Sequence, residues 1–276
     1  MHLPLCRDHL KQPKPPCQAG FLYLGTRPMA CHLRTKAACH RDDIRASYHL
    51  TRPRHPNLES DVLRRLLFAG YELQLNRAYR DRLASKGRTA QGVFWRSQSS
   101  QFARFEALLS LVHQLRGYQP TTIADIGCGY GALLDFINQS SNFRHIKYWG
   151  VDINRAMINA CRQKFPQQPD IFSTGNRPPS IVDFCLFSGT FNLTHSNNPA
   201  LWNDYIFACL DSCMAQTRYG LVLNLLCAPK AQIKKQIFYA SRAAFIERAE
   251  THFGPTHAQS TQYVTGDVSF VITRKH

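Results

Sequence analysis

The sequence predicts an α/β protein in which helices cover both faces of a mostly parallel sheet. Three observations support this fold class. An apolar strand runs into a glycine-rich loop at residues 123–131, which read I-A-D-I-G-C-G-Y-G, and a second apolar strand ends at the acidic residue Asp152. Beyond that point, short apolar runs alternate with helical segments. Such alternation is typical of a parallel sheet with helices on both sides.

Each element of this fold is predicted from apolar spacing and from helix start and stop signals. The seven expected strands are residues 121–126, 148–152, 170–173, 181–187, 220–226, 262–264 and 268–273. The last two strands face each other as a closing antiparallel hairpin. The helices expected within this region are residues 132–139, 155–164, 199–215 and 229–252, and proline opens the last two.

Two further helices are expected before the sheet, within residues 58–118, where they would cover the active site. The first begins near Asp61, and its apolar face contains Leu63, Leu66, Leu67, Tyr71 and Leu75. The second is expected at residues 99–115 with a serine at its N-cap. Its apolar face contains Phe102, Phe105, Leu108, Leu109 and Val112.

Residues 1–57 differ from the rest of the chain in composition. They hold 4 of the 10 cysteines, 6 of the 12 histidines and 7 of the 15 prolines, and they have no apolar periodicity. A zinc site is one interpretation, but the cysteines lack the closely spaced pairs of structural zinc sites. We therefore predict a disordered basic leader and no metal. The cysteines of this segment are Cys6, Cys17, Cys31 and Cys39.

Charge and hydropathy limit the possible partners and location. The net charge of +16 is concentrated in residues 1–119, where 20 Lys and Arg face 8 Asp and Glu. Such an excess favours anionic partners such as nucleic acid, although it is also compatible with an ordinary soluble surface. We expect no transmembrane helix, because no apolar run approaches the required length of about 18 residues. The N-terminus has no apolar signal region, which predicts a cytoplasmic protein.

The glycine loop has a spacing that points to a particular ligand. A dinucleotide-binding loop has the pattern G-x-G-x-x-G, whereas Gly127, Gly129 and Gly131 form a loop that is one residue shorter. Asp125 precedes the loop, and Asp152 follows Gly131 by 21 residues. Glycines let the backbone approach a ligand closely. A carboxylate after the second strand can accept hydrogen bonds from ribose hydroxyls. The alternative is an ordinary glycine turn with a surface aspartate.

This arrangement resembles motif I and the acidic ribose-binding position of class I S-adenosylmethionine (SAM) methyltransferases. The resemblance covers roughly residues 90–276 and implies a Rossmann-like, seven-stranded fold with SAM bound by residues 119–276. In that family the glycine loop contacts the methionine part of SAM, and an acidic residue at the position of Asp125 faces the methionine amino group. The resemblance therefore implies cofactor-binding roles for Asp125, Gly127, Cys128, Gly129, Gly131 and Asp152.

The same resemblance extends to the segments after the following strands. Ile153 and Met157 would pack against adenine, with plain core positions as the alternative. Asn176 stands where the family often has an acidic residue that binds the adenine amino group, and an amide oxygen can still accept that bond. Ser188 opens a segment that would border the methyl group, because ligands of open α/β sheets bind beyond the carboxyl ends of the strands.

A narrower resemblance is to a group of bacterial class I methyltransferases of unassigned substrate. It rests on residues 95–97, 100–101 and 104–105, together with the sequence S-G-T-F-N at 188–192. It implies that an arginine near the N-terminal helix, Arg104 or Arg96, binds the methionine carboxylate. The alternative is an arginine on the helix surface.

The acceptor is harder to predict than the cofactor, since direct methyl transfer needs few catalytic side chains. The N/D-P-P-Y/F motif of base-amino methyltransferases is absent, and Cys185 lies inside a strand, where it is expected to be core. His195 is a candidate base, or a surface histidine. We predict a SAM-dependent methyltransferase of a small molecule. The alternatives are an RNA methyltransferase with a basic N-terminal handle, a nicotinamide-dependent oxidoreductase and a non-catalytic methyltransferase-like protein.

Overall fold

The computed structural model describes residues 58–261 and 265–275, whose centre is a nine-stranded sheet. The order β3-β2-β1-β4-β5-β7-β6 runs across the sheet, while β9 pairs with both β5 and β8. The strands are β1 (Thr121–Ile126), β2 (Ile146–Asp152), β3 (Phe172–Thr174), β4 (Val182–Phe187), β5 (Thr217–Ala228), β6 (Gln232–Lys234), β7 (Ile237–Ser241), β8 (Thr256–Ser260) and β9 (Asp267–Thr273). The first five strands confirm the prediction closely.

The sheet is mostly parallel and is closed by an antiparallel pair, as predicted. Strand β1 lies parallel to β2 and β4, β3 lies parallel to β2, and β5 lies parallel to β4. Strand β9 runs antiparallel to β5 and to β8. The predicted first arm of this hairpin, residues 262–264, lies outside the described residues. The arm that pairs with β9 is β8, whose polar sequence T-H-A-Q-S carries no apolar alternation and gave no strand signal.

The helix predicted at residues 229–252 is wrong in its first half. Strands β6 and β7 form an antiparallel hairpin there, and helix α6 (Arg242–His252) begins after it. Lys235 and Gln236 join the two strands with φ angles of 48° and 62°, the left-handed pair of a tight hairpin turn. The residues around this turn, such as Ile233 and Phe238, favour strands, and Phe238 is buried in the core. The hairpin adds two strands to the seven that the sequence predicts.

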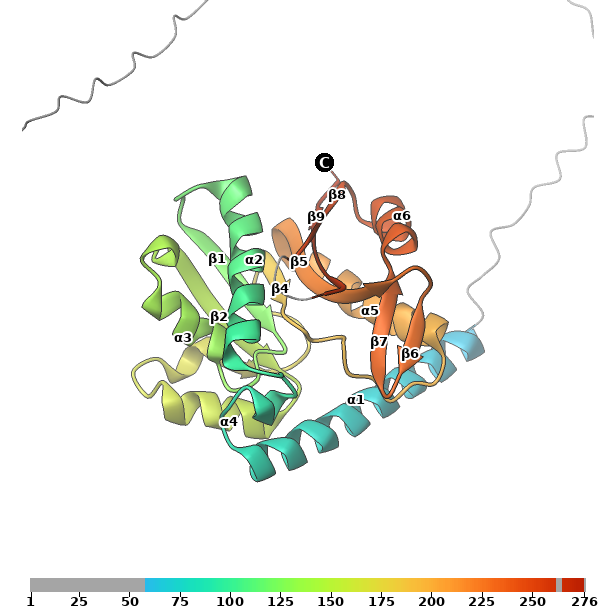
Figure 1. The fold of residues 1–276 in the computed structure, drawn as a ribbon, viewed down its shortest axis with the longest axis horizontal. Helices are drawn as coiled ribbons and strands as arrows, with labels where there is room; N and C mark the ends of the chain where they lie inside the picture. Colours follow the sequence, from blue (N-terminus) through green and yellow to red (C-terminus); the bar gives the residue numbers. More distant parts are fainter. Residues whose placement is uncertain (1–57, 262–264, 276) are drawn as a thin grey trace, which may run out of the picture. The chain divides into compact units, whose positions relative to one another are not determined.

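Helices cover both faces of the sheet, so the strands have two apolar faces (Figure 1). Ile123 of β1 packs in one core cluster with side chains of α2 (Gln98–Arg116), α3 (Ala132–Gln139) and α4 (Arg155–Lys164). The next residue, Ala124, packs in a second cluster with side chains of α5 (Pro199–Met214) and α6. This alternation follows from the two-residue period of a strand.

Two helices precede the sheet. Helix α2 (Gln98–Arg116) is capped by Ser97, whose side chain accepts a hydrogen bond from the Ser100 backbone N–H at 3.2 Å. Its predicted apolar face is buried except at Phe102, which is partly buried. The serine cap and the buried face confirm the prediction for this helix.

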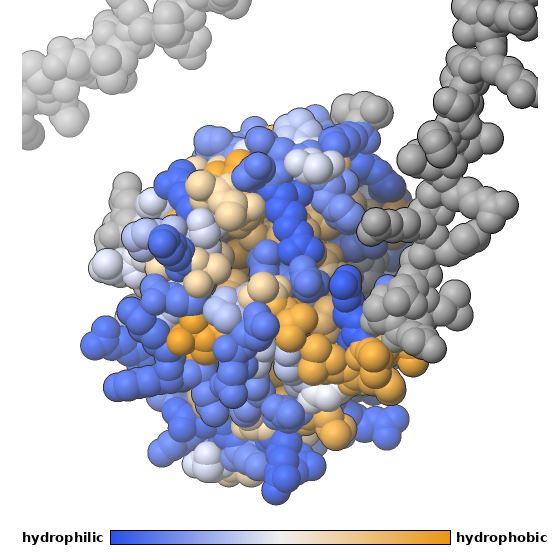
Figure 2. Space-filling view, turned by 90° about the vertical axis from the view of Figure 1, so that its right-hand side faces the viewer, coloured by the Kyte–Doolittle hydropathy of each residue, from blue (hydrophilic) through white to orange (hydrophobic). Residues whose placement is uncertain are grey.

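Helix α1 (Leu58–Lys86) buries only part of its predicted apolar face. Tyr71 and Leu75 are in the core, but Leu63 and Leu66 are 66% and 64% exposed. Figure 2 shows apolar side chains gathered on the side of the molecule where this helix begins. The beginning of the helix extends beyond the sheet in Figure 1, and its core contacts come from residues between Phe68 and Tyr79. Within residues 58–261 and 265–275, no helix combines the length and the apolar character that a membrane span requires.

Candidate functional site

The predicted cofactor residues gather around one cavity at the carboxyl ends of β1, β2 and β4. Eight of the ten line it, namely Asp125, Gly127, Cys128, Gly129, Asp152, Ile153, Asn176 and Ser188. Gly131 and Arg104 do not. Helices α1 and α2 also contribute lining residues, such as Asn76 and Gln101. The parallel strands bring these side chains together because their carboxyl ends meet at one edge of the sheet.

The glycine loop needs glycine at each of its three positions. The φ angles of Gly127, Gly129 and Gly131 are 79°, 55° and 80°, a region that residues with a Cβ rarely adopt. A Cβ on Gly127 would lie 2.8 Å from Thr190 Cγ2, and one on Gly131 would lie 2.8 Å from Phe165 Cε2. Gly131 therefore makes room for the end of α4 rather than for a ligand.

Asp152 is buried and is held in place by the glycine loop. Its Oδ2 accepts a hydrogen bond from Gly129 N–H at 2.9 Å, and its Oδ1 accepts one from Asn154 N–H at 2.7 Å. Burial raises the pKa of this carboxyl to about 6, although the two backbone hydrogen bonds lower it. An ionised carboxylate has about four acceptor sites, so Asp152 can still accept hydrogen bonds from the hydroxyl groups of a ligand.

Asp125 lies one strand away in an equally buried place. Its Oδ2 accepts a hydrogen bond from the Tyr148 hydroxyl at 2.9 Å. Burial raises the pKa of Asp125 to about 7, the hydrogen bond from Tyr148 lowers it, and the nearby charge of Asp152 raises it. A cationic ligand group beside Asp125 would favour the ionised form, because an opposite charge compensates for the lost hydration.

The loop after β4 forms the opposite wall of the cavity. Thr190 Oγ1 donates a hydrogen bond to the Ile126 carbonyl at 2.8 Å, which ties this loop to the end of β1. The Gly189 N–H donates to Asn224 Oδ1 at 2.8 Å. The Ser188 hydroxyl is buried and has no hydrogen-bond partner within the described part of the chain. Burying a hydroxyl without a hydrogen-bond partner costs free energy. This cost favours a ligand that forms a hydrogen bond with the Ser188 hydroxyl.

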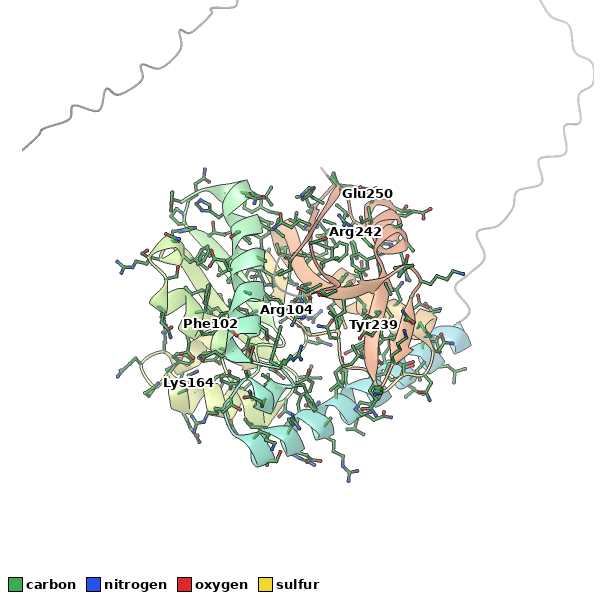
Figure 3. The ribbon with its side chains drawn as sticks, viewed as in Figure 1. Phe102, Arg104, Lys164, Tyr239, Arg242 and Glu250 are labelled. Carbon is green, nitrogen blue, oxygen red and sulfur yellow. The ribbon has the colours of Figure 1, made fainter. Side chains whose placement is uncertain are left out.

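A second cavity adjoins the first. Tyr79, Val93, Trp95 and Gly189 line both cavities, so they form the boundary between them. The two cavities enclose about 980 and about 1060 Å³, including parts that are open to solvent. Arg104 lines only the second cavity, and its Nε lies 2.9 Å from Asp267 Oδ1. Figure 3 shows Arg104 at the centre of the molecule, between α2 and the C-terminal strands.

Three other sequence candidates lie away from the cavities. His195 lines neither of them. Met157 is fully buried and also lines neither cavity, which decides for the core alternative. Cys185 is fully buried in β4, as expected for a core residue.

Sequence reasoning missed Tyr79, which lies on α1 at the boundary of the two cavities. The signal was present, because Tyr79 continues the four-residue spacing of Tyr71 and Leu75. Burial raises the pKa of Tyr79, and the charge of Asp152 raises it further. The hydroxyl therefore stays protonated and can donate a hydrogen bond near neutral pH.

Comparison with known proteins finds similarity to methyltransferases. A family model described as a methyltransferase domain matches residues 124–209, which run from β1 to the middle of α5. The protein named "Putative methyltransferase Rv1506c" of Mycobacterium tuberculosis (strain ATCC 25618 / H37Rv) is 28% identical over 147 residues. That match covers 52% of this chain and 87% of the relative.

Solved structures of methyltransferases are also similar. Magnesium protoporphyrin IX methyltransferase from Synechocystis PCC 6803, with bound SAM, has a TM-score of 0.44 at 15% identity, over 64% of this chain and 80% of its own. A SAM-dependent methyltransferase of Leishmania major has a TM-score of 0.48 at 13% identity, over 67% of this chain and 77% of its own.

The sheet topology is that of a Rossmann-like α/β fold, and the matched methyltransferase domain contains the glycine loop and its two aspartates. The methyltransferase domain at residues 124–209 and the methyltransferase relative indicate a SAM-dependent methyltransferase enzyme.

Proposed function

We propose that the first cavity holds SAM and that the enzyme methylates a small molecule bound in the second cavity. Asp152 would accept the ribose hydroxyls, and Asp125 would face the methionine ammonium group. Asn176 and Ile153 would contact adenine, while Gly127, Cys128 and Gly129 would lie against the methionine part. The observation that carries this proposal is the position of Asp152, fixed by the Gly129 N–H at the floor of the cavity.

The chemistry of the lining fits a cationic nucleoside. The cavity holds two buried carboxyls, Asp125 and Asp152, and an unpartnered buried hydroxyl at Ser188. When bound, SAM supplies a methyl group on a positively charged sulfur, which a nucleophile can displace directly. The protein then has to hold the two reactants in line and keep water out. Residues of α1 and α2 line the same cavity and would provide this cover.

A small-molecule acceptor is supported by the second cavity. It meets the first at Tyr79 and Gly189, next to the segment after β4 that the sequence assigned to the methyl group. Tyr79 lies at this boundary with a protonated hydroxyl, and we propose that it orients the acceptor by a hydrogen bond. His195 remains a sequence candidate for a base, although it lines neither cavity. A cytoplasmic location likewise remains a prediction from the sequence.

Calorimetric titration with S-adenosylhomocysteine (SAH) tests the cofactor assignment. We expect Asp152→Ala to weaken SAH binding at least about tenfold, because each lost hydrogen bond to a charged group costs on the order of 1.5–3 kcal/mol. Asp152→Asn, which retains an acceptor for Gly129, distinguishes lost binding from a disordered loop. Asp170→Ala is the matched control, since Asp170 is exposed and lines neither cavity. Unchanged SAH affinity in Asp152→Ala would remove the ribose assignment.

An RNA acceptor is the alternative, and the charge distribution is the observation that favours it. Residues 1–119 carry +12 of the net charge of +16. Binding to phosphates makes affinity fall steeply with salt, because counterions are released. Salt-dependent RNA binding that disappears when residues 1–57 are removed would favour RNA over a small molecule. No RNA binding at low salt would leave the small-molecule acceptor.

A further inference from the structure

Arg104 is buried at the wall of the second cavity. Its side chain is 9% exposed, and the guanidinium lies over the ring of Trp95 at 4.4 Å. The sequence resemblance implied that this arginine binds the methionine carboxylate of SAM. However, Arg104 lines the second cavity and not the one that contains Asp125 and Asp152. Its place in the fold therefore points to a different ligand.

A ring of contacts fixes the guanidinium. Asp267 Oδ1 lies 2.9 Å from Arg104 Nε and accepts a hydrogen bond from Asn224 Nδ2 at 2.8 Å. Asn224 in turn accepts from Gly189 N–H, and a Cβ on Gly189 would lie 2.7 Å from Trp95 Cζ2. The ring returns to Arg104 through its stacking on Trp95. A guanidinium held in this way is already oriented, so it loses little entropy on binding a ligand.

The contacts leave most of the guanidinium unused. Nε forms an ion pair with Asp267 but has no hydrogen-bond partner among residues 58–261 and 265–275, and no hydrogen bond of the two terminal nitrogens is seen within the same residues. These nitrogens carry four N–H donors in the planar arrangement that matches a carboxylate or phosphate. Because the side chain is more than nine-tenths buried and lines the second cavity, a ligand in that cavity can supply an acceptor for these donors.

The rest of the cavity lining also offers donors and no negative charge. Arg96 lines it with an exposed side chain, and none of its described lining residues is acidic. Asn192 uses its amide oxygen to accept from Leu226 N–H at 3.3 Å, and its NH₂ group is a further donor. Asp267 neutralises the charge of Arg104. The charge of Arg96 then leaves the cavity lining with a net positive charge. Apolar side chains such as Leu193 and Ile237 form the remaining wall.

We propose that the second cavity recognises the methyl acceptor by an anionic group, a carboxylate or a phosphate, which the terminal nitrogens of Arg104 bind and Arg96 attracts. The nucleophilic atom of this acceptor lies at the boundary near Tyr79 and Gly189, and its apolar part lies against the remaining wall. This inference rests on the proposed function, because it needs the first cavity to hold the cofactor. It assigns to the enzyme a small acidic substrate rather than a neutral one.

Fluorine NMR with small aromatic probes tests the proposal on the full chain saturated with SAH. The probes are 4-fluorobenzoate, 4-fluorophenyl phosphate and the uncharged 4-fluorobenzamide. We expect at least one anion to bind about tenfold more tightly than the amide, the margin of one charge-assisted contact. The stronger of the two anions tells a carboxylate acceptor from a phosphorylated one. Equal binding of all three probes, or binding of none at millimolar concentration, would overturn the proposal.

Variants connect the binding to Arg104. Arg104→Gln is expected to weaken binding of the anionic probe about tenfold, with SAH affinity unchanged. Because this change leaves Asp267 without its cation and threatens folding, Arg96→Gln is the second variant, with a smaller loss expected from an exposed charge. Arg116→Gln is the matched control on the same helix, since Arg116 lines neither cavity. Unchanged probe binding in both Arg104→Gln and Arg96→Gln would refute the assignment.

Two further results separate this proposal from the proposed function. If Arg104→Gln loses SAH affinity while probe binding is retained, Arg104 binds the methionine carboxylate and the proposal is wrong. If the probe competes with SAH, it occupies the first cavity, which also refutes the proposal. Failure of the wild-type protein to bind SAH would instead contradict the cofactor assignment. The probe titration without SAH would then still show whether an anion binds at Arg104.

Discussion

At the scale of single residues, the site depends on two carboxyls that the fold removes from water. Asp125 and Asp152 are 3% and 8% exposed, and their pKa values are raised to about 7 and about 6. Burying such groups costs stability whenever they are charged. A soluble surface would avoid that cost, so their placement beside a cavity is typical of a site for a cationic ligand.

Asp125→Asn tests this cost directly. The folded-state pKa of Asp125, about 7, lies above its ordinary value of 3.8. Its contribution to stability is therefore fully present below about pH 4 and is lost as the pH rises through 7. Between pH 4 and 8, the free energy of unfolding should fall less for the asparagine variant than for the wild type. The difference should reach about 4 kcal/mol, which corresponds to a pKa shift of about three units. Urea unfolding without ligand measures this, and parallel pH profiles for the two proteins would contradict it.

At the scale of elements, turns and loops carry the geometry that periodicity does not encode. The first half of the helix predicted at residues 229–252 is a hairpin, because Lys235 and Gln236 adopt a left-handed turn that no sequence signal indicates. Apolar spacing does not easily separate a short strand from a short helix. By contrast, α3 and α4 were predicted correctly, because each begins right after a glycine or asparagine cap and has a strong apolar face.

Two glycine-to-alanine substitutions should have opposite effects on stability. Gly189 has a φ of 69°, and a Cβ there would meet Trp95, so Gly189→Ala should lower the free energy of unfolding by about 1–2 kcal/mol or more. Gly70 lies inside α1 with nothing within 4 Å of an added Cβ, so Gly70→Ala should raise it by about 0.5–1 kcal/mol. Denaturant unfolding of both variants is the measurement. Unchanged or increased stability of Gly189→Ala would show that the loop after β4 is not held as described, and decreased stability of Gly70→Ala would contradict the prediction for α1.

At the scale of the whole molecule, the helices before the sheet belong to the site as well as to the fold. Residues of α1 and α2 line both cavities, and α1 supplies Tyr71 and Leu75 to the core. The proposed division is therefore a leader at residues 1–57, covering helices at 58–118 and a SAM-binding region at 119–276. The covering helices have no independent core in this arrangement, which ties their folding to that of the sheet.

Removal of residues 1–57 tests the proposed leader. We expect a chain that begins at Leu58 to keep the melting temperature and the SAH affinity of the full protein, because the leader sequence has no apolar periodicity with which to build a core. Thermal unfolding and calorimetry of both chains measure this. A large drop in melting temperature would show that the first 57 residues stabilise the fold.

The sequence alone determined the class of the protein, because the SAM motif is local. The residues of this motif, Asp125, the three glycines and Asp152, lie within 28 residues of one another. Their spacing predicts a strand, a loop, a helix and a second strand. The tertiary structure decided which side chains from distant segments of the chain lie together at the second cavity. Arg104 carries no local signal for its ligand, and only the packing of α2 against β9 sets it beside Asp267 and the second cavity. Asp267 lies 163 positions beyond Arg104 in the chain (267 minus 104), a separation that no local pattern relates.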